Sequence, residues 1–333
     1  MTVAFFQPLA LTLDVHLDAA DLRAALARDV RSGLGATRRS LPPTWFYDEH
    51  GSKLFEEITR LPEYYPTRAE RVLLERHAGE LAALTRSDTL VELGAGACEK
   101  TRVLLDALSA LGTLRRYVPF DVSADFLEAS ATALGRQYEG LHVHAVVGDF
   151  HRHLGKIPGG GRRLIAFLGG TIGNLVPSQR RRFFSELRGT MAPCDHLLLG
   201  SDLVKDVARI LAAYDDSKGV TGRFNRNLLH VVNRELDADF VPEHFAHVVR
   251  WDPLEQWIEM RLRSDRDQVV HVGALELTVP FSQDEELLTE ISAKFTPRGV
   301  ASELTRAGFV LDGQWGEDPG DFLLTLAHPA SRC

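Results

Sequence analysis

The chain has 333 residues, of which 44% are hydrophobic and 25% charged, and its formal net charge is -8. This composition is typical of a globular protein and excludes a disordered or fibrous chain. The length exceeds what a single hydrophobic core usually serves, so we expect two domains, or one domain with a large insertion. The acidic balance argues against a nucleic-acid partner, and the densest basic run, Arg180-Arg181-Arg182, is expected to form a solvated face.

The cysteines and the N-terminal residues are typical of a cytoplasmic protein. Cys98, Cys194 and Cys333 are not at metal-ligand spacing, and they do not suggest a disulfide framework. The first twenty residues contain Asp14 and Asp18 and lack the basic region of a secretory signal. No run of residues reaches the apolar length of a membrane span. We therefore expect a cytoplasmic protein without a membrane partner.

The N-terminal region begins with an amphipathic pattern over residues 19–33, which predicts a helix. Leu41-Pro42-Pro43 cannot continue a helix, and aromatic residues are frequent from Trp45 to Pro66. Thr67-Arg68-Ala69-Glu70 has the form of a capping box, which predicts that a second helix begins there.

From residue 89 onward, the hydrophobic pattern alternates between strands and helices. Strands are predicted over residues 89–93, 116–120, 142–147, 164–168 and 196–199. Helices are predicted over residues 99–110, 123–135 and 177–190. This alternation predicts a doubly wound α/β fold, in which helices cover both faces of a mostly parallel sheet.

The alternation is interrupted by an insertion. Residues 204–235 look mainly helical, and residues 245–280 look like antiparallel strands. A helix over residues 297–308 and strands over residues 310–315 and 322–326 then complete the first sheet. An insertion of roughly ninety residues is within the usual size of a small domain, so we expect a second, α+β domain.

A glycine loop follows the first strand of the alternating region, where Glu92-Leu93 leads into Gly94-Ala95-Gly96. Glycines at this place let the backbone turn tightly and approach a ligand. A dinucleotide fingerprint needs a third glycine where this chain has Glu99, and a carboxylate there repels a pyrophosphate. S-adenosylmethionine carries no phosphate and remains compatible with the loop. A plain turn between strand and helix is the alternative.

Acidic residues end the next two strands. Asp121 follows Pro119-Phe120 and can accept hydrogen bonds from both hydroxyls of a ribose. Asp149 can accept from an adenine amino group, and the neighbouring Phe150 can pack on the ring. Together with Glu92 near the end of the first strand, acidic groups at three successive strand ends favour an adenosine-containing cofactor, although Asp149 could instead cap a turn.

Six further segments resemble, together with the glycine loop, the histidine Nα-methyltransferases of ergothioneine biosynthesis. They are Leu41-Pro42-Pro43-x-Trp45-Phe46-Tyr47-Asp48, Thr59-Arg60-Leu61-Pro62-Glu63-Tyr64-Tyr65-Pro66-Thr67-Arg68, Leu168-Gly169-x-Thr171-Ile172-Gly173-Asn174-Leu175, Asp202-Leu203-Val204-Lys205-Asp206, Ala213-Tyr214-Asp215-Asp216 and Phe224-Asn225-Arg226-Asn227. The resemblance implies three successive methylations of the histidine α-amine by S-adenosylmethionine, giving hercynine. The chain departs from the general methyltransferase pattern at Cys98, where a third glycine is common.

The resemblance also implies a fold and a set of site residues. The fold is a Rossmann-like class I methyltransferase with a separate substrate-binding domain. We expect residues 70–203 and 295–333 to form the S-adenosylmethionine-binding domain, and residues 1–69 and 204–294 the substrate-binding domain. The residues expected to contact the cofactor are Gly94, Gly96, Lys100, Asp121, Asp149 and Phe150. The residues expected to contact histidine are Tyr64, Asn174, Tyr214, Glu290 and Ser292.

Methyl transfer to an amine is an in-line displacement that needs a neutral amine and good orientation more than acid–base catalysis. Asn174 and Tyr214 suit the substrate carboxylate, since both donate hydrogen bonds without charge. Glu290 and Ser292 suit the imidazole, and on a strand they share one face. Taken without the resemblance, this pair would be a solvated surface pair.

The remaining site predictions concern the amine side and the pocket wall. Tyr47 and Tyr64, with Asn174, are expected to be catalytic, because a phenol can accept a hydrogen bond from the amine and an aromatic face tolerates the growing cation. Buried aromatics beside prolines are the alternative. Thr171 and Met260 are expected to line the pocket, although Thr171 could cap a helix and Met260 could be core.

Four histidines between residues 142 and 153 raise the question of a metal. His142, His144, His151 and His153 lack an accompanying zinc signature, and methyl transfer needs no metal, so we expect packing or solvent-facing side chains and no metal ion. We expect a monomer that acts on a small molecule. A different amino acid or amine as substrate, and a cofactor-binding protein without turnover, are the open alternatives.

Overall fold

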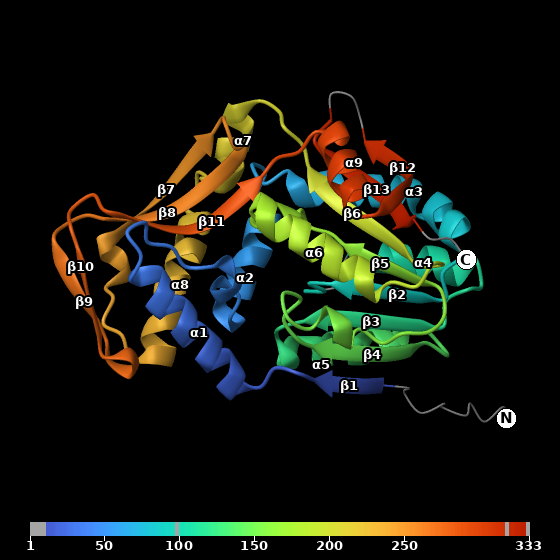
Figure 1. Ribbon diagram of the computed structural model, residues 1–333, viewed down its shortest axis with the longest axis horizontal. Coiled ribbons are helices and arrows are strands. Elements are labelled where there is room, and N and C mark those ends of the chain that lie inside the picture. The colour runs from blue at the N-terminus through green and yellow to red at the C-terminus, as the bar shows by residue number, and fades with distance from the viewer. Residues whose placement is uncertain (1–10, 97–99, 317–319, 331–333) are drawn as a thin grey trace.

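The computed structural model describes residues 11–96, 100–316 and 320–330. Its centre is an eight-stranded sheet in the order β1-β4-β3-β2-β5-β6-β13-β12 (Figure 1). These strands are β1 (Leu11–Val15), β2 (Thr89–Leu93), β3 (Arg116–Asp121), β4 (His142–Val147), β5 (Arg163–Phe167), β6 (His196–Asp202), β12 (Phe309–Gly316) and β13 (Phe322–Pro329). Strands β1 to β6 pair in parallel, while β13 is antiparallel to both β6 and β12. The predicted doubly wound, mostly parallel sheet is confirmed.

Helices cover both faces of this sheet, because its central strands are buried on both sides. One face packs against α3 (Pro66–Thr85), α4 (Thr101–Ala110) and α5 (Ala124–Gln137). The other face packs against α6 (Pro177–Thr190) and α9 (Pro297–Arg306). Two short 3-10 helices, η2 (Leu154–Lys156) and η3 (Thr171–Asn174), lie in the loops before β5 and α6.

The second unit consists of the predicted insertion and most of the N-terminal region. Its helices are α1 (Ala19–Leu34), η1 (Pro43–Phe46), α2 (Glu49–Thr59), α7 (Val207–Tyr214), α8 (Val220–Leu236), η4 (Pro242–His244) and η5 (Gly273–Leu275). Its strands form a sheet of β7 (Phe245–Asp252), β8 (Trp257–Ser264) and β11 (Glu286–Ala293), and a hairpin of β9 (Gln268–Val272) and β10 (Leu277–Phe281). One hydrophobic cluster joins these elements.

Strand β1 differs from the sequence-based expectation, which places residues 1–69 wholly with the insertion. It pairs in parallel with β4 at the edge of the eight-stranded sheet. The short pattern of this strand carries no strong signal, and only its partner stabilises it. His142 and His144 of β4 bond to Thr12 and Asp14 of β1 at 2.9 and 2.7 Å, so these two histidines have the predicted packing role.

The start of α3 also differs from the prediction. The helix begins at Pro66, after Tyr65, and no side chain caps it. Proline is favoured at this position because its missing N–H would have no partner there. Glu70, the expected capping partner, instead has no exposed surface and binds the backbone N–H of Gly169 at 2.7 Å. Helix α2 was not predicted at all.

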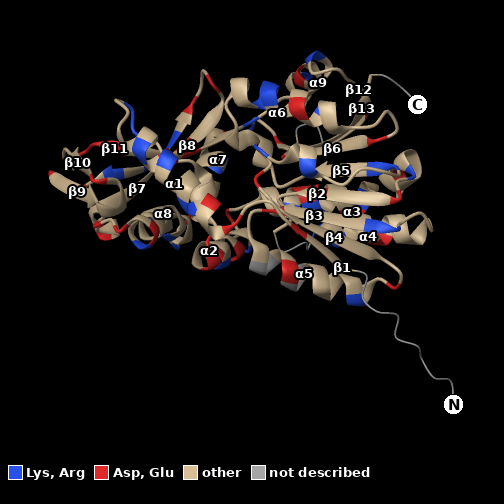
Figure 2. Cartoon of the chain, turned by 60° about the horizontal axis from the view of Figure 1, so that its bottom comes forward, with Lys and Arg blue, Asp and Glu red and all other residues tan. Residues whose placement is uncertain are grey.

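The charged residues are distributed over the whole chain, and basic and acidic positions are interspersed along α1, α6 and α9 (Figure 2). The expected solvated face of three arginines is wrong at Arg180, which is buried and forms an ion pair with Glu303 of α9 at 2.8 Å. The reason is that α9 packs beside α6, a neighbour that the local sequence does not reveal.

Two other findings concern the cysteines and the membrane. Cys194 is disulfide-bonded, which the spacing of the cysteines does not predict, and Cys98 and Cys333 lie outside the described residues. Spacing along the chain is a poor guide here, because tertiary packing decides which sulfurs meet. Within the described ranges, no helix combines the length and the apolar character needed to cross a membrane.

Candidate active site

The glycine loop lies at the carboxyl end of β2, where an open α/β sheet binds its ligands. Gly94 and Gly96 have φ values of 72° and 48°, which L-residues rarely adopt. A Cβ added to either would meet no atom within 4 Å, so the backbone conformation, rather than crowding, requires glycine. Glu99 and Cys98, on which two of the sequence arguments depend, lie outside the described residues.

Asp121 ends the neighbouring strand β3 and faces this loop. Its carboxylate accepts hydrogen bonds from the backbone N–H of Gly96 at 3.1 Å and of Ser123 at 3.2 Å. A carboxylate has about four acceptor positions, so further donors can bind. Burial raises the pKa of Asp121, an effect that these backbone hydrogen bonds oppose.

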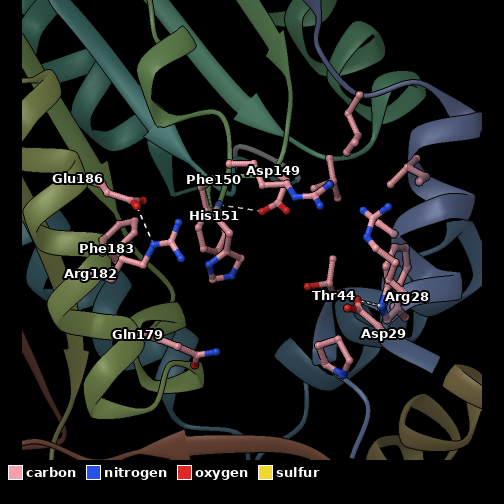
Figure 3. Close-up of a pocket in the computed structure, with 17 residues that line it drawn as sticks. Arg28, Asp29, Thr44, Asp149, Phe150, His151, Gln179, Arg182, Phe183 and Glu186 are labelled. Atoms are coloured by element: carbon pink, nitrogen blue, oxygen red, sulfur yellow. Dashed lines mark hydrogen bonds and ion pairs between the residues drawn. The ribbon is translucent and has the colours of Figure 1, made fainter. Parts of the chain in front are cut away.

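Asp149 and Phe150 line a cavity of about 340 Å³ between α6 and the segment that contains α1 and η1 (Figure 3). Asp149 accepts a hydrogen bond from the backbone N–H of His151 at 2.8 Å, so it both caps a turn and lines the cavity. Phe150 packs against Phe167 and Phe183, with ring centroids 5.4 and 5.9 Å apart. The ring is thereby fixed in place at the cavity wall.

Lys100 lies at the start of α4 and forms an ion pair with Glu70. Since Glu70 also accepts from Gly169, the pair connects α3, α4 and the loop after β5. A Cβ on Gly169 would lie 3.6 Å from the Lys100 Nζ, so the lysine reaches this loop. The sequence predicts Lys100 at the site but gives no indication of its buried partner.

Glu92 is a second buried carboxyl group near the glycine loop, and the sequence assigned it no contact of its own. It accepts hydrogen bonds from the hydroxyls of Thr101 and Tyr117, the latter at 2.6 Å. Burial raises the pKa of Glu92 to about 7, although both hydrogen bonds lower it. Glu92 therefore links β2 to β3 and α4 beneath the loop.

Glu290 and Ser292 lie on β11, and both are buried, with 9% and 5% of their surface exposed. The alternative of a solvated surface pair is therefore wrong. Burial raises the pKa of Glu290 to about 7, and the charge of Lys294 opposes this rise. An irregularity in the pairing of β11 with β8 falls between Leu288 and Glu290, immediately before the pair.

The charge of Glu290 acts on three tyrosines, Tyr47, Tyr64 and Tyr214. The rings of Tyr64 and Tyr214 are 6.3 Å apart, and Phe55 lies between Tyr47 and Tyr64 at 5.5 and 6.2 Å. Burial is the main cause that raises the pKa of all three phenols, and the Glu290 carboxylate raises each of them further. The three hydroxyls are therefore neutral at physiological pH.

The other predicted pocket residues lie on elements that contact β11. Met260 on β8 is the cross-strand partner of Glu290 and is 2% exposed. The 3-10 helix η3, which ends at Asn174, packs so closely on β11 that a Cβ on Gly173 would lie 2.8 Å from the Ala293 carbonyl oxygen. Thr171 donates to the Leu168 carbonyl at 3.0 Å and does not cap η3.

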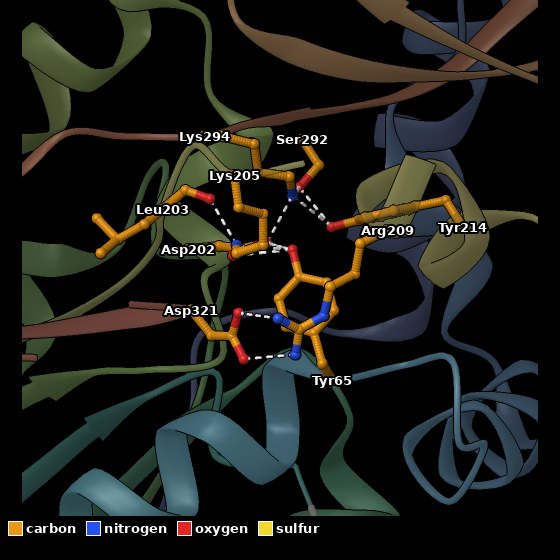
Figure 4. A network of polar contacts seen from close by, with 9 residues as sticks. All are labelled: Tyr65, Asp202, Leu203, Lys205, Arg209, Tyr214, Ser292, Lys294 and Asp321. Carbon is orange, nitrogen blue, oxygen red and sulfur yellow. Dashed lines mark hydrogen bonds and ion pairs between the residues drawn. The ribbon is translucent and has the colours of Figure 1, made fainter. Parts of the chain in front are cut away.

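A polar network connects Tyr214 and Ser292 to the main sheet, and no role was predicted for its central residues (Figure 4). Lys294 follows β11 and binds Tyr214, Ser292 and Asp202, the last residue of β6. Lys205 binds the other oxygen of Asp202. Asp202 and Lys205 could have been found from sequence, because both lie in one of the segments that resemble the family. Lys294 lies in none of these segments.

Among the residues that the structure describes, one histidine–carboxylate group has ligand atoms close enough for a metal ion: His196, Asp312 and His328. It lies at the start of β6, at the opposite end of the sheet from the glycine loop, and includes none of the four histidines considered above. His196 Nδ1 and His328 Nε2 have no hydrogen-bond partner, whereas metal-bound histidines usually donate from that nitrogen. A hydrogen bond of 2.9 Å between His328 and Asp312 accounts for the contact.

Comparison with known proteins identifies relatives of the chain. A family model described as histidine-specific methyltransferase, SAM-dependent, matches residues 26–329. The histidine N-alpha-methyltransferase of Mycobacterium tuberculosis (strain CDC 1551 / Oshkosh) is 58% identical and covers 91% of this chain and 94% of that protein. The histidine N-alpha-methyltransferase of Mycolicibacterium smegmatis is 53% identical and covers 96% of this chain and 99% of that protein. The L-tryptophan methyltransferase of Psilocybe serbica is 28% identical, over 91% of both chains.

These matches extend over both the eight-stranded sheet and the insertion, and the sheet is the Rossmann-like class I arrangement that the resemblance implied. The family model covers nearly the whole described chain. The protein thus belongs to the family of histidine-specific, S-adenosylmethionine-dependent methyltransferases.

Proposed function

We propose that the protein methylates the α-amine of L-histidine three times with S-adenosylmethionine, giving hercynine for ergothioneine biosynthesis. The observation that carries the proposal is the buried Glu290 carboxylate, which lies two residues before the buried Ser292 on β11 and is close enough to Tyr47, Tyr64 and Tyr214 to raise the pKa of all three phenols. A buried carboxylate needs a partner, and an imidazole N–H supplies one. The two mycobacterial relatives named histidine N-alpha-methyltransferase support this choice of substrate.

The residues at the carboxyl ends of β2, β3 and β4 fit S-adenosylmethionine. Asp121 has free acceptor positions for ribose hydroxyls, and the cavity beside Asp149 and Phe150 offers an acceptor and a fixed aromatic ring for adenine. Gly94 and Gly96 leave open space beside the backbone. Lys100 uses one N–H donor on Glu70 and has further donors for a carboxylate. When bound, the cofactor supplies a methyl group on a sulfonium centre.

We assign the substrate contacts as follows. Glu290 accepts from one imidazole nitrogen, and Ser292 bonds the other. Asn174 and Tyr214 donate to the substrate carboxylate, while Met260 and Thr171 form parts of the wall. This arrangement would hold the α-amine on the side of Tyr47 and Tyr64.

The chain contributes orientation rather than strong acid–base catalysis. Because the pKa values of Tyr47 and Tyr64 are raised, their hydroxyls stay protonated and use oxygen lone pairs to accept from the amine. A neutral amine held in this way keeps its own lone pair free for the methyl group. The aromatic rings favour the positive charge that develops on nitrogen.

The same proposal includes the organisation of the chain. We infer a cofactor-binding domain of residues 70–203 and 295–333 and a substrate-binding domain of residues 1–69 and 204–294, with β1 transferred to the former because it extends that sheet. We further propose that the protein acts as a cytoplasmic monomer without a bound metal, a nucleic acid or a membrane.

The test is incubation of the pure protein with S-adenosylmethionine and single amino acids, followed by mass spectrometry. Histidine should gain one, two and then three methyl groups. Methylation of a different amino acid would replace the proposed substrate, and the relative named L-tryptophan methyltransferase makes tryptophan the first comparison. Cofactor binding by calorimetry without any methylated product would instead favour a protein without turnover.

A further inference from the structure

Lys294 is the most deeply enclosed charged side chain next to the substrate pocket, with no exposed side-chain surface. Its ammonium group has three N–H donors, and each has an acceptor. They reach Tyr214 Oη at 2.8 Å, Ser292 Oγ at 2.8 Å and Asp202 Oδ2 at 2.9 Å (Figure 4). No donor remains for a substrate, so Lys294 can act on a substrate only through its neighbours.

The two hydroxyl groups that it contacts also bind each other. Tyr214 Oη and Ser292 Oγ are 2.7 Å apart, so one of them donates its proton to the other. Because an ammonium cannot accept a hydrogen bond, both oxygens must accept from Lys294. Of the two hydroxyl protons, one is used between the oxygens and one is left over. The pair can therefore donate to a single acceptor atom of a ligand.

We propose that Lys294 is a positioning residue for the substrate, which fixes the hydroxyls of Tyr214 and Ser292 so that one O–H is offered to an acceptor on histidine. The proposal rests on the proposed function and narrows its contacts, because only one of two donations can then be made: from Tyr214 to a carboxylate oxygen, or from Ser292 to an imidazole nitrogen. Asp202 holds the ammonium group in place from the end of β6, and thereby connects the cofactor-binding sheet to the pocket.

The charges around the network agree with this role. Two lysines, Lys294 and Lys205, share the single carboxylate of Asp202, which leaves one positive charge in excess. Lys294 also lowers the pKa of Glu290, against the effect of burial. Its charge therefore favours the ionised carboxylate that the imidazole N–H needs.

Lys205 provides a matched control. It binds the same aspartate and is nearly as enclosed, with 8% of its side-chain surface exposed. Its other side-chain contacts are the Tyr65 hydroxyl at 2.9 Å and the Leu203 carbonyl, not the Tyr214–Ser292 pair. Replacing either lysine leaves Asp202 with one cation, and only the replacement of Lys294 releases the two hydroxyls.

The experiment measures histidine binding by calorimetry with S-adenosylhomocysteine present, and S-adenosylhomocysteine binding alone. Lys294→Met should weaken histidine binding roughly 10- to 100-fold and leave S-adenosylhomocysteine binding unchanged. Lys205→Met should change neither. In a Ser292→Ala background the same Lys294→Met change should cost clearly less, because one of its two targets is already absent.

Two results would overturn the inference while the proposed function stands. One is an equal loss of histidine affinity in Lys294→Met and Lys205→Met, and the other is a histidine affinity of Lys294→Met within about twofold of wild type. A wild-type protein that binds S-adenosylhomocysteine but no histidine would contradict the proposed function and the inference together. If either Met variant fails to fold, as judged by circular dichroism, Lys294→Gln and Lys205→Gln give the same comparison with side chains that keep a donor.

Discussion

Glu290 and Met260 are cross-strand partners in the sheet of β11 and β8. A carboxylate is thus held beside a buried thioether, with little access to water. This position explains why burial raises the pKa of Glu290 to about 7. A group in this environment gains most from a ligand that donates a hydrogen bond to it.

Replacement of Glu290 should therefore affect substrate binding and not cofactor binding. Glu290→Ala is expected to weaken histidine binding roughly 100-fold, since a hydrogen bond to a charged group is lost. Calorimetry with histidine and with S-adenosylhomocysteine checks this. The control is Glu286→Gln, on the same strand as Glu290, which removes a charge that is paired with Arg250 of β7. This variant should bind histidine like wild type. An unchanged histidine affinity in Glu290→Ala would refute the assigned contact.

Asp121 should have the opposite selectivity. Asp121→Asn keeps one acceptor oxygen but loses the charge and one acceptor for a ribose hydroxyl, so S-adenosylhomocysteine binding should weaken roughly tenfold or more. Asp106→Asn is a suitable control, because Asp106 on α4 accepts a hydrogen bond from Tyr138. Equal cofactor affinity in the two variants would show that Asp121 serves only to hold the glycine loop.

The glycine loop allows a test of backbone strain that is separate from crowding. Gly94→Ala places a Cβ in open space at a φ of 72°, so it should lower the free energy of unfolding by about 1 to 2 kcal/mol. Gly79→Ala, in the middle of α3 and also in open space, should raise it by about 0.5 to 1 kcal/mol. Urea unfolding of both variants measures the difference. Similar stabilities would show that the loop tolerates an ordinary residue.

Glu92 should make stability depend on pH. Its pKa is about 7 in the folded protein and near 4.5 when unfolded, so the folded state holds an extra proton between these values. Its stabilising effect is thus complete below about pH 4.5 and is lost as the pH rises through about 7. Burial raises the pKa of Glu290 in the same direction, so Glu290 makes its own contribution to this pH dependence.

The corresponding variant is Glu92→Gln, whose carbonyl oxygen can still accept from Thr101 and Tyr117. The loss of unfolding free energy between about pH 5 and about pH 8 should be smaller than in wild type by about 2 to 3 kcal/mol. Urea unfolding at the two pH values measures this loss of unfolding free energy. The control is Glu57→Gln, at the exposed ion pair with Arg223, which should lose as much unfolding free energy as wild type. An undiminished loss in Glu92→Gln would mean that Glu92 is ionised in the folded protein.

Local sequence determined the alternating strands and helices, the glycine loop at the end of β2 and the aspartates at the ends of β3 and β4. The reason is that hydrophobic periodicity and turn residues act over a few neighbouring positions, and parallel strands bring their carboxyl ends to one edge. Local pattern was not enough at β1, because a short edge strand is stabilised only by its partner β4.

Only the tertiary structure decided which distant residues meet at the proposed histidine site. Nothing in the sequence around Lys294 indicates that it binds Asp202 and Tyr214, which are about 90 and 80 positions away along the chain. In the same way, the spacing of Glu290 and Ser292 predicts a shared face but not its burial, which follows from packing against α7 and η3. Burial and pairing depend on the elements packed around a residue, and they decide whether a polar side chain is part of a solvated surface or of a binding site.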